Sequence, residues 1–175
     1  MGIDLKRAVF LDRDGTLNPE IFYADTQAHE SPRTPQELTL LPGAAEALLR
    51  LQQAGFLLFL VSNQPNVAKG KNTSAELAAI HGRLEQLLAA SGVTLTESFY
   101  CYHHPDYTGP CPCRKPSPHF LLQAQARYNL DMVHSWMIGD RDSDIECGRR
   151  AGVRTLRAGG SMTLASVAEE VMRYL

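Results

Sequence analysis

The chain has 175 residues, of which 44% are hydrophobic and 21% charged, and its formal net charge is −2 at pH 7. These values are ordinary for a globular protein with a proper hydrophobic core, and we expect residues 1–175 to form a single domain. The balance of 17 basic and 19 acidic residues argues against a protein whose main function is to bind nucleic acid, although a local basic groove stays compatible with it.

The apolar runs are short throughout the chain. None approaches the roughly 20 apolar residues that span a bilayer, so we predict no membrane association. The segment MGIDLKRAVFLDRD at the N-terminus has a brief apolar run that ends in charges, unlike the core of a signal peptide. We therefore expect a cytoplasmic protein.

Five short apolar runs, each followed by polar residues or glycine, predict buried strands. They are Ala8–Leu11, Leu57–Val61, Ser98–Tyr100, Trp136–Ile138 and Arg154–Leu156.

Five segments with helical spacing of apolar residues alternate with these strands. They are Gly43–Ala54, Ser74–Ala90, Pro118–Tyr128, Asp142–Ala151 and Leu164–Tyr174. Ser74 is the expected N-cap of the second helix. The alternation predicts an α/β fold, with a parallel sheet covered by helices on both faces.

In such sheets, ligands bind beyond the carboxyl ends of the strands. Here those ends carry Asp12, Ser62, a cysteine cluster and Asp140. The sequence therefore predicts one functional site at this edge of the sheet.

Asp12 and Asp14 follow the first predicted strand, in the segment DRDGT. Residues two apart on an extended segment point to the same side, so both carboxylates are predicted to face one site. A divalent cation such as Mg²⁺ would relieve their repulsion and also neutralise a phosphate. Asp12 could then attack phosphorus, while Asp14 protonates the leaving oxygen and later deprotonates water. Taken alone, the pair is equally compatible with a solvated acidic turn.

Later segments supply the other groups that phosphoryl transfer needs. Ser62 and Asn63 offer a hydroxyl and an amide to a phosphoryl oxygen, and Lys115 offers a positive charge. The acidic segment GDRDSD, residues 139–144, contains Asp140 as the expected metal ligand. Each feature alone is typical of a protein surface, but their combination in this order favours a phosphoryl-transfer site.

With these residues in place, the chain resembles the haloacid dehalogenase-like (HAD-like) hydrolases, whose motifs run DxDGT, Ser/Thr, Lys and GDxxxD. The matching residues are Asp12–Thr16, Ser62, Lys115 and Asp140–Asp144, and the resemblance covers about residues 8–157. It implies a Rossmann-like sheet, an aspartyl-phosphate intermediate, and Mg²⁺ held by Asp12, the backbone carbonyl of Asp14 and Asp140. Asp144 is expected to orient its neighbours.

Three thiols and one imidazole occur within 13 residues, which predicts an inserted zinc loop at about residues 101–113. The candidate ligands are Cys101, His103, Cys111 and Cys113. Their C-x-H and C-x-C spacing suits tetrahedral Zn²⁺ in a closed, structural site. Ordinary thiols beside an unrelated histidine are the alternative. His104 is the weaker histidine candidate, and Cys147 is expected to be a buried small hydrophobe.

Arg114 and Lys115 directly follow the last predicted zinc ligand. A zinc ion would thus hold the segment that brings Lys115 to the active site. The planar guanidinium of Arg114 suits a two-pronged contact with a phosphate or hydroxyl group of the substrate.

Within the HAD-like hydrolases, a zinc loop followed by CRKP resembles the D-glycero-D-manno-heptose 1,7-bisphosphate phosphatases and the histidinol-phosphate phosphatases. The segments His103-His104-Pro105 and SNQ…AKG are more similar to the heptose group, which acts in heptose synthesis for cell-surface lipopolysaccharide. This resemblance implies that Asn63, Gln64, Arg114 and Lys115 lie near the substrate, with Lys69 a weaker candidate.

Three departures from the heptose pattern keep other substrates open. The stretch that usually reads TNQSG-x-ARG is SNQPNVAKG here, and the gap between His103 and Cys111 is closer to the histidinol-phosphate group. The segment Asp140-Arg141…Asp144-Ile145 also resembles that group. Histidinol phosphate or another small phosphate monoester therefore stays an alternative. So does a non-catalytic module that binds a phosphorylated ligand, although the intact acid–hydroxyl–lysine–acid set favours an enzyme. A polynucleotide-end phosphatase would need a basic groove that the composition does not favour.

The intervals between the motifs leave little room for a large cap domain. Roughly 50 residues separate Asp12 from Ser62, and a similar number separate Ser62 from Lys115. Residues 19–41, with Tyr23, His29 and Arg33, are the best candidate for a specificity loop. No long amphipathic seam is left unassigned, so we expect a monomer.

Overall fold

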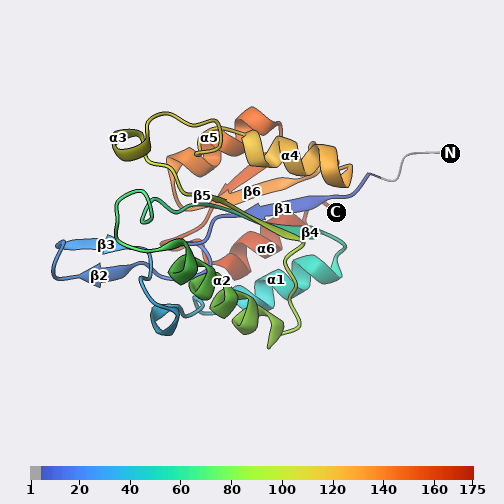
Figure 1. Cartoon of the computed structure of the whole chain (residues 1–175). Coiled ribbons are helices and arrows are strands. Elements are labelled where there is room, and N and C mark those ends of the chain that lie inside the picture. The colour runs from blue at the N-terminus through green and yellow to red at the C-terminus, as the bar shows by residue number, and fades with distance from the viewer. Residues whose placement is uncertain (1–4) are drawn as a thin grey trace.

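The computed structural model describes residues 5–175. Residues 1–4 lie outside the described residues. They belong to the predicted single domain and to the N-terminal segment that was compared with a signal peptide. At the centre is a five-stranded sheet with the order β5-β4-β1-β6-β7. All four strand pairings in it are parallel (Figure 1).

Each of the five predicted strands is present, in most cases one or two residues longer than expected. They are β1 (Ala8–Leu11), β4 (Leu57–Asn63), β5 (Glu97–Cys101), β6 (Trp136–Gly139) and β7 (Arg154–Arg157). A small antiparallel hairpin, β2 (Ile21–Tyr23) and β3 (Ala28–Glu30), was not predicted, because strands this short carry little periodicity.

The five predicted helices are also present, with small changes at their ends. They are α1 (Ala44–Gln53), α2 (Ser74–Ala89), α4 (His119–Tyr128), α5 (Asp142–Ala151) and α6 (Leu164–Met172). Two single turns, η1 (Pro35–Glu37) and α3 (Pro105–Thr108), were not predicted.

The predicted N-cap of α2 is wrong by one residue. Thr73 rather than Ser74 takes this position, because its hydroxyl accepts the Glu76 N–H at 3.2 Å. The Glu76 carboxylate in turn accepts the Thr73 N–H at 2.7 Å. This reciprocal capping box satisfies two backbone donors at once, which Ser74 could not do with the same glutamate.

The helices cover both faces of the sheet, as predicted. In Figure 1, α1, α2 and α6 lie below the sheet, while α4 and α5 lie above it. Alternate residues of β1 enter separate cores: Val9 and Leu11 pack with the lower helices, and Ala8 and Phe10 with the upper ones. Because both faces are buried, the central strands are continuously apolar.

The carboxyl ends of the strands point to the side of the molecule where the β2–β3 hairpin and α3 lie (Figure 1). The hairpin belongs to the predicted specificity loop, residues 19–41, and no larger cap is inserted in the described part of the chain. Within residues 5–175, none of the helices combines the length and apolarity needed to cross a bilayer.

Candidate active site

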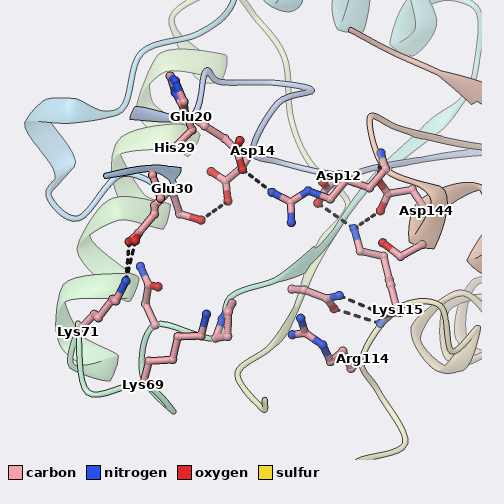
Figure 2. Close-up of a pocket in the computed structure, with 17 residues that line it drawn as sticks. Asp12, Asp14, Glu20, His29, Glu30, Lys69, Lys71, Arg114, Lys115 and Asp144 are labelled. Carbon is pink, nitrogen blue, oxygen red and sulfur yellow. Dashed lines mark hydrogen bonds and ion pairs between the residues drawn. The ribbon is translucent and has the colours of Figure 1, made fainter. Parts of the chain in front are cut away.

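A cavity of about 390 Å³ opens beyond the carboxyl ends of β1, β4 and β6. The predicted site residues in its wall are Asp12, Asp14, Asn63, Lys69, Arg114, Lys115 and Asp144. Figure 2 shows how these side chains converge from segments that are far apart in the sequence.

Lys115 lies at the floor of this cavity and is only 3% exposed. Its ammonium group is 2.8 Å from Asp12 Oδ1 and 2.6 Å from Asp144 Oδ1 (Figure 2). It also donates to the carbonyl oxygen of Val61 at 2.7 Å. Three acceptors therefore compensate for the burial of one positive charge.

Asp144 reaches Lys115 from the first turn of α5. Its other carboxylate oxygen accepts the Arg141 N–H at 3.0 Å, which caps the helix. A Cβ atom at Gly139 would come within 2.3 Å of this carboxylate, so the chain needs glycine at the end of β6. The ion pair with Lys115 and the contact with the Arg141 N–H are the neighbours that Asp144 could orient, and that role stays a prediction.

Gly15 provides the corresponding space for Asp140. Its φ angle is +80°, and a Cβ atom there would lie 2.4 Å from Asp140 Oδ2. Only glycine adopts this backbone conformation at little cost and also admits the close approach of a carboxylate.

Asp12, Asp140 and Asp144 form a group whose carboxylate oxygens lie within 4.8 Å of one another. Burial raises the pKa of Asp12 to about 6, and burial together with the Asp144 charge raises that of Asp140. Asp140 Oδ1 is buried and has no hydrogen-bond partner among the described residues. A hard divalent cation would neutralise the negative charge of these carboxylates and bind the Asp140 oxygen that has no partner, so the residues fit Mg²⁺.

The Asp14 carboxylate lines the same cavity as Asp12, as predicted, but its immediate partners are different. Its side chain lines the cavity, but it lies outside the Asp12 group and pairs with the guanidinium of Arg13 at 3.1 Å. Although burial alone would raise it, the pKa of Asp14 is lowered by Arg13 and by hydrogen bonds from Asn18, Ser31 and Gln64. The positive charge of Arg13 thus offsets the repulsion between the Asp12 and Asp14 carboxylates. Arg13 has no role in the sequence-based prediction, which assigns this effect to a metal ion.

Ser62 and Gln64 lie behind the cavity wall rather than in it. Gln64 is completely buried and donates to Asp14 Oδ2 at 2.5 Å and to Ser62 Oγ at 2.9 Å. Gln64 is not among the residues that line the cavity, and its amide nitrogen is engaged by Asp14 and Ser62, whereas its Oε1 has no hydrogen-bond partner among the described residues. Ser62 is 1% exposed, so its hydroxyl does not reach the cavity either.

Asn63 lines the cavity and also holds the Lys115 segment. Its side-chain oxygen accepts the Lys115 N–H at 3.1 Å, and its amide nitrogen donates to the Lys115 carbonyl at 3.2 Å. This two-point contact joins the end of β4 to the segment that follows the cysteine cluster.

The predicted zinc ligands converge on one point. Their four ligand atoms, from Cys101, His103, Cys111 and Cys113, lie within 4.8 Å of one another. The three sulfur–sulfur distances are 3.1, 3.6 and 3.8 Å, and His103 Nδ1 is 3.4 and 3.6 Å from two of the sulfur atoms. Sulfur atoms around a tetrahedral zinc ion, with Zn–S about 2.3 Å, lie about 3.8 Å apart, so the cluster is close to the size that zinc requires.

The neighbouring histidine has a different role. His104 caps α3 by accepting the Asp106 N–H at 3.2 Å, so it lies outside the cluster. Cys147 is completely buried in the upper core, as predicted. Arg114 lines the cavity and donates to the His103 carbonyl at 3.1 Å, which links it to the cysteine cluster.

The β2–β3 hairpin forms one wall of the cavity. The sequence pattern identifies only the loop that contains it, residues 19–41. Of the three residues singled out there, His29 lines the cavity, whereas Tyr23 and Arg33 brace the hairpin, with the guanidinium 3.8 Å from the ring centroid. Seven further polar residues in the wall were given no role: Glu20, Glu30, Ser31, Asn66, Lys71, Arg141 and Ser143. Arg141 and Ser143 lie within the acidic segment 139–144, but no motif marks Glu20, Glu30 and Ser31, because only the folded hairpin brings them over the site.

Two ion pairs fasten this hairpin to the rest of the site. Lys71 Nζ lies 2.7 and 2.8 Å from the two carboxylate oxygens of Glu30 (Figure 2). On the other side, Arg141 pairs with Glu20. In these pairs, the charges of Lys71, Glu30, Arg141 and Glu20 are compensated. Of the other cations in the wall, Lys69 and Arg114 have no carboxylate partner within 4.0 Å among the described residues.

Comparison with known proteins places these features in context. The HAD-hydrolase-like family model matches residues 112–169. The D-glycero-β-D-manno-heptose-1,7-bisphosphate 7-phosphatase of Yersinia pestis is 36% identical over 164 residues, which cover 89% of this chain and 83% of the relative. The enzyme of the same name from Escherichia coli K12 is 35% identical, over 89% of this chain and 82% of the relative.

Solved structures are similar over nearly the whole chain. The D,D-heptose 1,7-bisphosphate phosphatase of B. bronchiseptica, crystallised with magnesium and phosphate, aligns with a TM-score of 0.81 at 29% identity. The alignment covers 97% of this chain and 99% of that one. A putative HAD-like phosphatase from Mesorhizobium loti gives a TM-score of 0.80 at 29% identity, over 99% of this chain and 91% of that one.

Proposed function

Since the chain belongs to the HAD-like heptose-bisphosphate phosphatase family, we propose that it removes the 7-phosphate of D-glycero-D-manno-heptose 1,7-bisphosphate. The observation that carries the catalytic part is the buried contact of Lys115 with Asp12. The substrate is supported by relatives of that name that share at least 35% identity with this chain over 89% of its length.

In this mechanism Asp12 is the nucleophile and Asp14 the general acid and base. An Asp12 oxygen forms a bond to phosphorus while the bond from phosphorus to the sugar oxygen breaks, and that oxygen takes a proton from Asp14. A water molecule then attacks the aspartyl-phosphate, gives its proton to Asp14 and releases phosphate. The Lys115 ammonium stabilises the negative charge that develops on the phosphoryl group.

The carboxylates of Asp12 and Asp140 and the backbone carbonyl of Asp14 would hold Mg²⁺, with Asp144 keeping Lys115 in place. When bound, the ion supplies positive charge that offsets repulsion between the substrate phosphate and the acidic groups. Ser62 would act indirectly, because its hydroxyl accepts a hydrogen bond from Gln64, which in turn holds Asp14.

The four ligands at residues 101–113 would hold a structural Zn²⁺. The zinc would then fix the segment that carries Arg114 and Lys115, since both follow Cys113 directly. We assign Asn63, Arg114 and Lys69 to substrate contacts, because all three line the cavity and the last two have no acidic partner within residues 5–175. Gln64 acts indirectly, through Asp14.

We further propose that the protein acts as a cytoplasmic monomer on a small soluble ester, without nucleic-acid or membrane partners. Histidinol phosphate is the second candidate substrate, supported by the short gap between His103 and Cys111. A cavity of this size, rich in charged groups, suits either small ester.

The test is phosphate release from heptose 1,7-bisphosphate, histidinol phosphate and a panel of sugar phosphates, each with Mg²⁺ and with EDTA. We expect strong preference for the heptose bisphosphate and no turnover in EDTA. Asp12→Asn should abolish turnover without unfolding the chain, and activity within tenfold of wild type would refute the nucleophile. If only another ester is hydrolysed, the mechanism stands and the substrate assignment is wrong. If no ester is hydrolysed, a phosphate-binding module is favoured. A stable dimer in sedimentation would contradict the monomer.

A further inference from the structure

Four side chains donate hydrogen bonds to the Asp14 carboxylate, and they come from three parts of the fold. Arg13 and Asn18 lie in the same turn as Asp14, at 3.1 and 2.9 Å from Oδ1. Gln64 reaches Oδ2 from the end of β4 at 2.5 Å. Ser31, directly after β3, reaches the same oxygen through its hydroxyl at 2.7 Å.

Ser31 differs from the other three donors in its exposure to the cavity. Arg13 is 1% exposed, and Asn18 and Gln64 are completely buried. Ser31 is only partly buried and lines the cavity wall. It is therefore the one donor of the four that lies between Asp14 and the space where a substrate would bind.

The position of Ser31 depends on the hairpin. Its neighbour Glu30 is held by Lys71 and by Arg33, the latter at 3.2 Å, so the end of β3 is fixed from two directions. Asp14 Oδ1 is held by its own turn, whereas Oδ2 is held by Ser31, by Gln64 and, at 3.2 Å, by Arg13 Nη2. Ser31 is the contact to Oδ2 on the cavity side, so its loss would leave the carboxyl group held only from the buried side and change its tilt toward the cavity.

We infer that Ser31 is a positioning residue, which sets the orientation of Asp14 for proton transfer to the leaving oxygen of the substrate. This inference rests on the proposed phosphatase function. The hairpin then has a second role besides forming the cavity wall, because it supplies part of the geometry of the general acid. The effect of Ser31 must be largest for substrates whose leaving oxygen needs a proton.

The test compares two esters with different leaving groups. Heptose 1,7-bisphosphate releases an alkoxide, which must be protonated as it leaves, whereas p-nitrophenyl phosphate releases a stable phenolate. The quantity to measure is kcat/KM, because it reports the steps up to loss of the leaving group and excludes the later hydrolysis of the aspartyl-phosphate.

Ser31→Ala should lower kcat/KM for the alkyl ester by about tenfold, and for the nitrophenyl ester by less than about twofold. Ser31→Thr keeps a hydroxyl and should recover most of the alkyl activity. Thr39→Ala removes an exposed hydroxyl from the same loop, residues 19–41, and serves as the matched control, with no difference expected between the esters. Thermal unfolding of each variant verifies the fold.

Equal losses on both esters, or no loss on either, would overturn the role of Ser31 while the phosphatase function stands. Failure of the Thr variant to recover activity would also count against it. A wild-type protein that hydrolyses neither ester would remove the proposed function and this inference together.

Discussion

Lys115 Nζ lies 2.8 Å from Asp12 Oδ1, although 103 residues separate the two in the chain. The same ammonium group also contacts Asp144, so two buried carboxylates share one buried cation. This contact couples the integrity of the candidate site to the stability of the fold, and it can be tested through both.

Lys115→Met should reduce both activity and stability. Removal of the cation deprives the phosphoryl group of its positive partner, and we expect kcat to fall by at least about 100-fold. The buried carboxylates of Asp12 and Asp144 would also lose the positive charge that compensates them, which should lower the free energy of unfolding by about 3–5 kcal/mol. Steady-state kinetics and urea denaturation measure the two effects.

Lys71→Met is the matched control for stability, because it removes an ammonium group from the more exposed pair with Glu30. Such a pair contributes about 0–1 kcal/mol, so its loss should be small. Similar stability losses in the two variants would contradict the special role of Lys115.

Gly15→Ala should weaken magnesium binding. The new Cβ would lie 2.4 Å from Asp140 Oδ2 and would push this carboxylate out of its group. Calorimetric titration should show an affinity at least about tenfold lower, in line with displaced metal ligands. Gly152→Ala has a similar φ angle, +78°, but nothing within 4 Å of the added atom, so it should cost only stability. Equal magnesium affinity in the Gly15 variant and wild type would disprove this account.

Magnesium binding should depend on pH because of the buried carboxyl of Asp12. Its pKa is raised by burial to about 6 from 3.8, so between these values the metal-free folded protein holds a proton that the unfolded chain has lost. Asp12 therefore adds stability to the metal-free protein as pH falls from 6 toward 4, and none of this contribution is present well above pH 6.

Magnesium requires the ionised carboxylate, so protons compete with it below about pH 6. The increase in Tm that magnesium causes should be full at pH 7.5 and clearly smaller at pH 5. Melting curves with magnesium and with EDTA at both values measure this. The same increase at pH 5 and pH 7.5 would show that Asp12 is already ionised without the metal.

Replacement of Cys111 and Cys113 by Ala should remove zinc and lower activity. The cluster would lose two of its four ligands, and the link from Arg114 to the His103 carbonyl would loosen. Elemental analysis of the purified protein should give about one zinc per chain for wild type and none for the variant. Cys147→Ala, outside the cluster, should keep its zinc. A wild-type protein without zinc would refute the zinc site itself.

Much of the fold was predictable from local patterns. The five central strands and five main helices appear as short apolar runs and helical periodicity, because each buries a regular face. The predicted cap at Ser74 failed for a local reason: Thr73 has its own glutamate three residues later. The β2–β3 hairpin was not predicted, because its strands have only three residues each, are partly exposed and show no clear alternation of apolar and polar residues.

The groups available for chemistry could be identified from the amino-acid sequence: the acidic pair, the lysine, the second acidic segment and the four candidate zinc ligands are set by residue type and order. Tertiary structure decided how these groups are used. It turned Asp14 toward Arg13, withdrew Gln64 from the cavity and placed Ser31 and Glu30 over the site. The physical reason is that hydrogen bonds and ion pairs between distant segments depend on where the sheet and the hairpin bring them together, and no local pattern records that position.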